Sequence, residues 1–204
     1  MKKRFLICGF LLASLLVFSQ AGYEVGYIIR NTGDTIKGKI KDKKYTTGIA
    51  NSDKINFIDS TGKEKNKTPD EIKQYCKKGT QFFRSLPIGL EGKLKFAEVL
   101  EYGDVILFGY ISASLVSTTS EILSKPIDKN KDGKPDNPKN LEYFLQKRRD
   151  PNSLMKVKPK KFRETVSFFF QNDSEIMKKI EDNSLGYDDI RFVVKTHNEL
   201  AEKK

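Results

Sequence analysis

One ten-residue stretch, DKNKDGKPDN at 128–137, has side chains that could bind a metal ion. Calcium loops of the EF-hand type take side-chain ligands from positions one, three, five and nine and a backbone carbonyl from position seven, with glycine at six. Counted from residue 128, position six is Gly133, and oxygen-bearing side chains stand at the four side-chain ligand positions, Asp128, Asn130, Asp132 and Asp136. This spacing predicts a weak calcium site.

The second half of the loop departs from that pattern. Position twelve, which carries a bidentate glutamate in EF-hands, is Lys139, and position eight is Pro135. Lysines also balance the carboxylates within the segment, at Lys129, Lys131, Lys134 and Lys139. Asp, Asn, Gly and Pro are the ordinary residues of turns, so two interpretations stay open. The stretch either holds calcium weakly, as the one cofactor of the protein, or is a turn-rich connection without metal.

A second chemical feature is a basic segment at 147–163, with a net charge of +7 because Asp150 is its single acidic residue. Its eight basic residues could bind an anionic polymer of the cell envelope, such as lipopolysaccharide or an acidic glycan, or stray nucleic acid. They are Lys147, Arg148, Arg149, Lys156, Lys158, Lys160, Lys161 and Arg163. The alternative is a solvated lysine-rich surface, since aromatic residues are not interleaved with the basic ones as a stacking platform requires.

Residues suited to catalysis are few. His197 is the single histidine, so neither a histidine-centred triad nor a typical zinc site can be assembled. Its place on the apolar side of a predicted helix indicates a packing role. Paired carboxylates can cleave glycosides without histidine, and Glu98 and Glu101 are candidates, whereas Asp188–Asp189 suits a helix cap. We therefore expect a non-enzymatic protein, with a carboxylate-based hydrolase acting on glycan as the alternative.

The N-terminus has the pattern of a secretory signal peptide. Basic residues at 2–4 precede an uncharged apolar run, Phe5 to Phe18, which is shorter than the roughly 20 residues that span a bilayer. We expect residues 1–19 to be removed and the mature chain to be soluble, without a transmembrane segment, in the periplasm or outside the cell. Removal of three basic residues lowers the formal charge from +11 to +8. Cys76 is then the one thiol, which excludes an intramolecular disulfide.

Alternating apolar and polar residues predict strands through most of 20–147. A hairpin is expected at 22–41, around a turn at 31–34, with one face made of Tyr23, Val25, Tyr27 and Ile29 opposite Ile36 and Ile40. Further strands are expected at 54–59, 79–86, 93–102, 104–112 and 141–147. Between the last two, residues 113–140 form a long loop.

Helices are expected in two parts of the chain. Threonine, proline and glutamate at 68, 69 and 71 resemble a capping box, which predicts a short helix from Thr68 to Gly79. After residue 148, apolar residues recur at helical spacing in three stretches, two of which follow the capping pair Asp173–Ser174 and Gly186.

Strands followed by helices indicate the α+β class. We expect an antiparallel β-sheet or partly closed barrel in the N-terminal two-thirds, packed with two or three C-terminal helices. The β-rich region at 20–147 and the helical region at 148–204 would form one compact unit.

Several stretches together resemble small exported proteins of Bacteroidetes. They are GYIIRNTGDTIKGKIK, KTPDEIKQY, KFAEVLEYGDVILFGY, LEYFLQK and FRETVSFFFQNDSEIMKKIEDNSLGYDDIRFVVKTHN, which span most of the chain after residue 19. Where that family tends to have tyrosine before the final asparagine, this chain has His197. The resemblance implies export and strands followed by helices, and it implies no activity. We therefore expect an exported structural or binding module of the cell envelope, or a weak calcium- or polyanion-binding protein.

Overall fold

The computed structural model describes residues 22–44, 50–111 and 141–203, and strands make up most of them. In chain order the strands are β1 Glu24–Arg30, β2 Thr35–Lys44, β3 Ala50–Ile58, β4 Glu64–Lys67, β5 Ile72–Lys77, β6 Gln81–Leu86, β7 Lys95–Glu101, β8 Val105–Ile111, β9 Leu141–Lys147 and β10 Asp150–Val157. They form one sheet in the order β10-β9-β8-β7-β6-β5-β1-β2-β3-β4, and every neighbouring pair is antiparallel. The expected antiparallel sheet is therefore confirmed.

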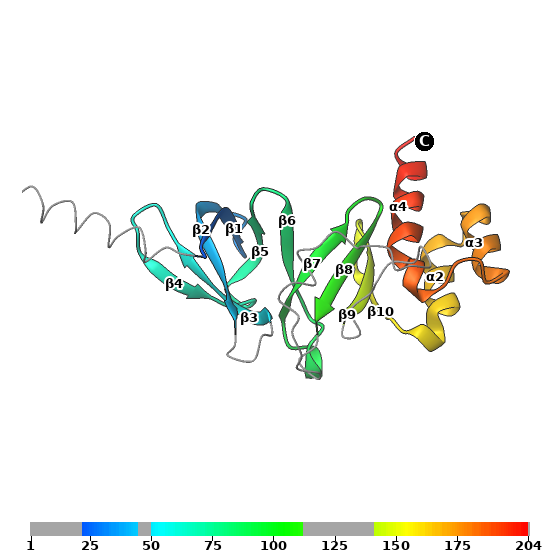
Figure 1. Ribbon diagram of the computed structural model, residues 1–204, viewed down its shortest axis with the longest axis horizontal. Helices are drawn as coiled ribbons and strands as arrows, with labels where there is room; N and C mark the ends of the chain where they lie inside the picture. Colours follow the sequence, from blue (N-terminus) through cyan, green and yellow to red (C-terminus); the bar gives the residue numbers. More distant parts are fainter. Residues whose placement is uncertain (1–21, 45–49, 112–140, 204) are drawn as a thin grey trace, which may run out of the picture.

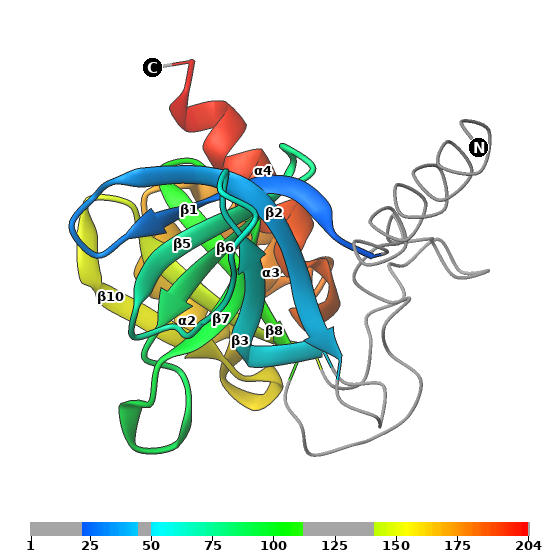
Figure 2. The same cartoon turned by 90° about the vertical axis from the view of Figure 1, so that its left-hand side faces the viewer.

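The sheet curls but does not close into a barrel. Strand β3 contacts β7 and β8 without joining their hydrogen-bonded ladders, and an ion pair links Asp53 of β3 to Lys95 of β7. Figure 2 shows β1 and β2 passing in front of β5, β6 and β7, with the helices behind. The free edges are β10 and β4, and the charged sequence EKNK of β4 discourages pairing with another chain.

The helices lie together at one end of the molecule, away from β1–β4 (Figure 1). They are α2 Phe162–Phe170, α3 Ser174–Glu181 and α4 Ile190–Ala201, with short 3-10 turns at Leu90–Gly92, Pro159–Lys161 and Tyr187–Asp189. Helix α4 packs on β7 and β8, and α2 packs on β10. In the described part of the chain, no helix has the length and apolar character needed to cross a membrane. The strands and the helices together confirm the expected α+β class.

Three clusters of buried apolar side chains connect these layers. The first joins the helices to β8 and β9, the second fills the curl of β1–β3, β5 and β7, and the third lies against β6–β9. Strand β7 contributes to all three, through Phe96 in the second, Ala97 in the third and Leu100 beside the first. Because successive side chains of a strand point to opposite faces, one strand can link separate cores.

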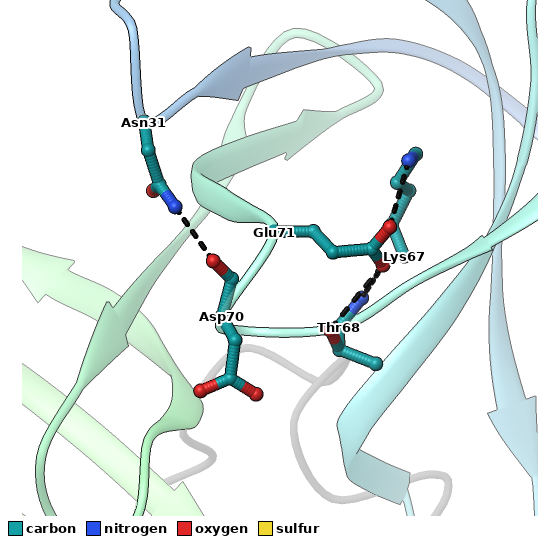
Figure 3. Close-up of polar contacts among 5 residues, drawn as sticks. All are labelled: Asn31, Lys67, Thr68, Asp70 and Glu71. Carbon is teal, nitrogen blue, oxygen red and sulfur yellow. Dashed lines mark hydrogen bonds and ion pairs between the residues drawn. The ribbon is translucent and has the colours of Figure 1, made fainter.

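The segment from Thr68 to Gly79 corrects a sequence expectation, because it is a turn followed by β5 and not a helix. The carboxylate of Glu71 accepts hydrogen bonds from the Thr68 N–H and hydroxyl at 2.9 and 3.2 Å (Figure 3). This is one half of the predicted capping box, because the Glu71 N–H donates to the Thr68 carbonyl and not to its hydroxyl. Asn31 also donates to the Asp70 carbonyl at 2.6 Å, which ties this turn to the β1–β2 turn.

Helix initiation fails at this point because β1 and β6 pair with β5 on both sides. That pairing buries Ile72 and Tyr75 in the second cluster. A helix of this length is marginal by itself, so burial in the sheet decides the conformation.

The hairpin of β1 and β2 forms as expected, and Ile36 and Ile40 of β2 face the core as predicted, but the inward face of β1 was predicted wrongly by one residue. Ile28 pairs with Ile36 and is 1% exposed, whereas Val25, assigned to the core face, is 73% exposed. The face that packs inward is the one that carries Ile28.

Two glycines explain this error. Gly26 and Gly38 pair with each other on the inward face, and a Cβ on either would collide with the backbone carbonyl of Cys76 or Ile58. Glycine is needed where strands approach this closely, yet it adds no hydrophobic signal to the pattern. The alternation of the remaining residues therefore favoured the opposite face.

Strands β4, β5 and β10 were not expected from the sequence. Strand β10 begins the segment expected to be helical, and it contains Pro151, which an edge strand tolerates. Its register with β9 is irregular between Asp150 and Met155. The polar and irregular character of an edge strand removes the alternation that predicts a strand.

Candidate functional site

The predicted calcium ligands Asp128, Asn130, Asp132 and Asp136 lie outside the described residues. Within 22–44, 50–111 and 141–203, no three His, Cys, Asp or Glu side chains are grouped so that they could hold a metal ion. The calcium site therefore stays a prediction from the sequence.

The basic segment at 147–163 is divided by the fold into two ends of one strand. Lys147, Arg148 and Arg149 lie at the β9–β10 turn, whereas Lys158, Lys160 and Lys161 lie beyond the other end of β10. An eight-residue strand is about 25 Å long. Residues that are close in sequence therefore form two separate surfaces.

Several of these cations have contacts within the protein. The Nζ of Lys147 lies 4.4 Å from the centre of the Phe168 ring, and Lys156 pairs with Glu142 at 2.7 Å. Lys161 pairs with Glu164 at 3.2 Å, and Arg163 donates to the carbonyl oxygens of Ile180 and Glu181 at the end of α3. Half of the basic segment is thus engaged in contacts that hold the fold together.

The other four cations are exposed, and the described residues place no carboxylate in contact with them. They are Arg148, Arg149, Lys158 and Lys160. Two lie at each end of β10. These side chains are available to an anionic ligand.

The end of β10 that carries Arg148 and Arg149 is called the arginine end, and the end that carries Lys158 and Lys160 is called the lysine end. The arginine end differs from the lysine end because exposed aromatic side chains lie on elements beside it. The Arg148 N–H donates to the Asp104 carbonyl at 2.9 Å, so the β9–β10 turn lies beside the β7–β8 turn, which carries Tyr102. Tyr102 is 58% exposed, and Phe168, under Lys147, is 46% exposed. The fold thus places Phe168 under Lys147 and brings the turn that carries Tyr102 beside the turn that carries the arginines.

Helix α4 fixes the β7–β8 turn through Asn198. The buried Asn198 amide accepts a hydrogen bond from the Val105 N–H at 3.0 Å and donates one to the Val105 carbonyl at 2.8 Å. Gly103 leaves room for it, because a Cβ there would collide with the Asn198 side chain. Arg191 adds a 2.6 Å ion pair with Glu101. These contacts hold the turn rigidly in place.

His197 precedes Asn198 on α4 and lies between two carboxylates. Its Nδ1 is 3.5 Å from Asp173 and its Nε2 is 3.9 Å from Asp104, while its ring packs edge-on against Phe170 at 4.9 Å. The side chain is 17% exposed. The expected packing role is confirmed, and the buried Nε2 makes no hydrogen bond within the described part of the chain.

No family model, no curated protein and no solved structure matches this chain. Its site must therefore be argued from its own residues.

The carboxylates considered for catalysis have structural contacts. Glu101 binds Arg191, and Asp189 accepts a hydrogen bond from the Gly186 N–H at 2.8 Å, which confirms the expected cap. Glu98 lies on β7 opposite Phe83, with one carboxylate oxygen buried. Cys76 is fully buried, and burial raises the pKa of its thiol, which opposes formation of a nucleophilic thiolate.

Two tyrosines with perturbed pKa values belong to the core that the helices cover. The rings of Tyr143 and Tyr187 lie 5.6 Å apart, and burial, with the charges of Glu142 and Asp188, raises the pKa of Tyr187 to about 12. Burial also raises the pKa of Tyr143. Both phenols therefore stay protonated at neutral pH and contribute to packing.

The aromatic residues of the arginine end were missed by sequence reasoning, although a signal for one was present. Residues 168–170 are three consecutive phenylalanines in a predicted amphipathic helix. One apolar face cannot bury three consecutive positions, so at least one ring must point outward. Tyr102 gave no such signal, because an exposed tyrosine in a turn is common.

Proposed function

We propose that this chain is an exported, non-enzymatic binding module of the cell envelope that binds an anionic polymer. The N-terminal pattern of basic residues followed by an apolar run supports export, and the formal charge of +8 that remains without residues 1–19 supports an anionic partner. A module of this kind binds through surface side chains presented by a rigid fold.

One observation carries the proposal. Arg148, Arg149, Lys158 and Lys160 are exposed cations that touch no carboxylate among the described residues, whereas the other four basic residues of 147–163 have contacts within the fold. A cation already neutralised by a carboxylate gains little from a ligand. Free cations release bound counterions from a polyanion, which drives binding.

The test is titration of the chain from residue 20 onward with heparin at several salt concentrations. We expect binding that weakens steeply with salt, since each cation contributes roughly one unit to the slope of log affinity against log salt. Replacing Arg148, Arg149, Lys158 and Lys160 by serine should lower the affinity at least about tenfold and reduce that slope.

A matched control removes the same number of charges elsewhere. Serine at Lys37, Lys63, Lys73 and Lys93, all exposed in the strand-rich part, leaves the same net charge. We expect this control to lose no more than about threefold in affinity. Equal losses in both variants, or no binding by the parent chain, would refute the proposal.

A further inference from the structure

The two ends of β10 are not equivalent as binding surfaces. The arginine end comprises Tyr102, Lys147, Arg148, Arg149 and Phe168. The lysine end has Lys158 and Lys160 around Pro159, and no exposed large apolar side chain lies between 157 and 167 in the described chain. Only the arginine end joins cations with exposed aromatic rings.

Charge alone is weak at the arginine end. Three cations there, at 147–149, lie near two carboxylates, Asp104 and Asp150. The net charge of these five side chains is therefore close to +1. Charge alone contributes little to affinity at this surface, so a ligand must gain affinity from other contacts as well.

Arginine and exposed aromatic rings supply such contacts. A guanidinium forms paired hydrogen bonds with planar or tetrahedral anionic groups, which a lysine ammonium cannot do. An exposed aromatic ring offers an apolar surface to the C–H face of a sugar ring. Tyr102 is 58% exposed and has no described partner that covers it.

The turns that present these groups are held in place before a ligand arrives. The Ser153 hydroxyl donates to the Asp150 carbonyl at 2.6 Å and accepts from the Lys147 N–H at 2.7 Å, which fixes the β9–β10 turn. Asn198 fixes the neighbouring β7–β8 turn through Val105. A preformed surface loses less entropy on binding.

We propose that the arginine end is a binding site for an anionic polysaccharide. Arg148 and Arg149 bind its sulfate or carboxylate groups, and the exposed ring of Tyr102 stacks on a sugar ring. This inference rests on the proposed function and deepens it, because it chooses one of the two cationic ends and one class of polymer. The lysine end then contributes charge without selectivity.

The experiment compares a heparin oligosaccharide with a linear polyphosphate of equal charge by calorimetric titration. Tyr102→Ser should weaken binding of the oligosaccharide about tenfold, as loss of one stacking contact does, and change polyphosphate binding less than about twofold. Tyr102→Trp should restore the oligosaccharide affinity. The double variant Arg148→Ser, Arg149→Ser should weaken oligosaccharide binding more than Lys158→Ser, Lys160→Ser, although both lose two charges.

Each result has a distinct meaning. Circular dichroism spectra that match the parent would confirm that the variants fold. Equal effects of Tyr102→Ser on both probes, or of the two double variants on the oligosaccharide, would refute the inference while leaving the proposed function intact. Tighter binding of single-stranded DNA with the same dependence on Tyr102 would replace the polysaccharide with nucleic acid. Failure of the parent chain to bind any polyanion would refute the proposed function itself.

Discussion

Asn198 is the side chain that ties α4 most directly to the sheet. Its amide satisfies both the N–H and the carbonyl of Val105, at the point where β8 begins, and Val105 is 1% exposed. A buried backbone group without a partner costs more than the hydrogen bond itself contributes, because it has also lost its contact with water. This residue therefore combines a stabilising and a positioning role.

We predict that Asn198→Ala lowers the free energy of unfolding by about 2–3 kcal/mol, since it leaves two buried backbone groups unpaired. Asn198→Asp should cost at least as much, because a carboxylate cannot donate to the Val105 carbonyl. Urea denaturation measures both. Glu199→Ala is the control on the same helix turn, and it should change stability by less than about 0.5 kcal/mol. If Asn198→Ala were as stable as the control, the two hydrogen bonds between Asn198 and Val105 would not stabilise the fold.

At the scale of elements, Thr68 and Glu71 predicted the start of a helix, but their side chains stabilise the turn between β4 and β5 instead. Glu71 accepts hydrogen bonds from Thr68 and pairs with Lys67 at 3.1 Å. Partial burial raises the pKa of Glu71, but the hydrogen bonds from the Thr68 N–H and Lys67 together outweigh it, so the net pKa is lowered. These contacts of Glu71 therefore stabilise a tight connection between two strands.

We predict that Glu71→Gln destabilises the protein at neutral pH by about 0.5 kcal/mol, a small value because solvent screens this half-exposed side chain. A folded-state pKa below the unfolded value means that the ionised form stabilises the fold, fully above about pH 4.5 and progressively less as the pH falls through the folded-state pKa. The parent and the variant should therefore have the same urea midpoint at about pH 2.

Glu175→Gln serves as the comparison for this measurement. Glu175 pairs with Lys179 along α3 at 2.7 Å, is 73% exposed and accepts no hydrogen bond from a backbone N–H of the described residues. Its effect reports the loss of an ordinary surface ion pair. A pH-independent difference for Glu71→Gln would show that the turn does not depend on the ionised carboxylate.

At the scale of the whole molecule, the two ends are joined by one continuous sheet. The helices pack on the first core and the curl of β1–β3 encloses the second, and β7 contributes side chains to both. A strand shared by separate cores transmits the loss of one to the other. We therefore expect the described parts to unfold together.

Hydrogen exchange tests this coupling. We predict that Ile28→Ala, which empties a fully buried position in the second core, costs about 2–5 kcal/mol. Amides of α4, at the other end of the molecule, should lose the same amount of protection as those of β1. Val25→Ala, on the exposed face of the same strand, should change neither. Unchanged protection of α4 in Ile28→Ala would show that the two ends unfold independently.

Much of the fold could be predicted from local pattern. Period-two alternation marked β1–β3 and β6–β9, and period 3.6 with caps at Asp173 and Gly186 marked the helices, because each of these elements buries one regular face. The pattern failed for β5, where pairing on both sides overrode a helix start, and for the hairpin face, where glycines hid the inward side.

Less of the candidate site could be predicted. The sequence identified the basic residues and predicted one basic surface, whereas strand β10 divides these residues between two surfaces, one at each of its ends. Neither the contact of Lys147 with Phe168 nor the closeness of Arg148 to the β7–β8 turn leaves a trace in the linear order. Such groupings depend on which strands lie side by side, and that is decided by packing between distant segments.

The sequence by itself determined the α+β class, the type and order of most elements, the basic character of the chain and its limited means for catalysis, because these follow from composition and from the period of nearby residues. Only the tertiary structure decided which face of β1 is buried, that residues 72–77 are a strand, and which cations touch no carboxylate among the described residues. The physical reason is that burial and pairing join residues far apart in the chain, and their free energy exceeds the local preferences that a sequence pattern records.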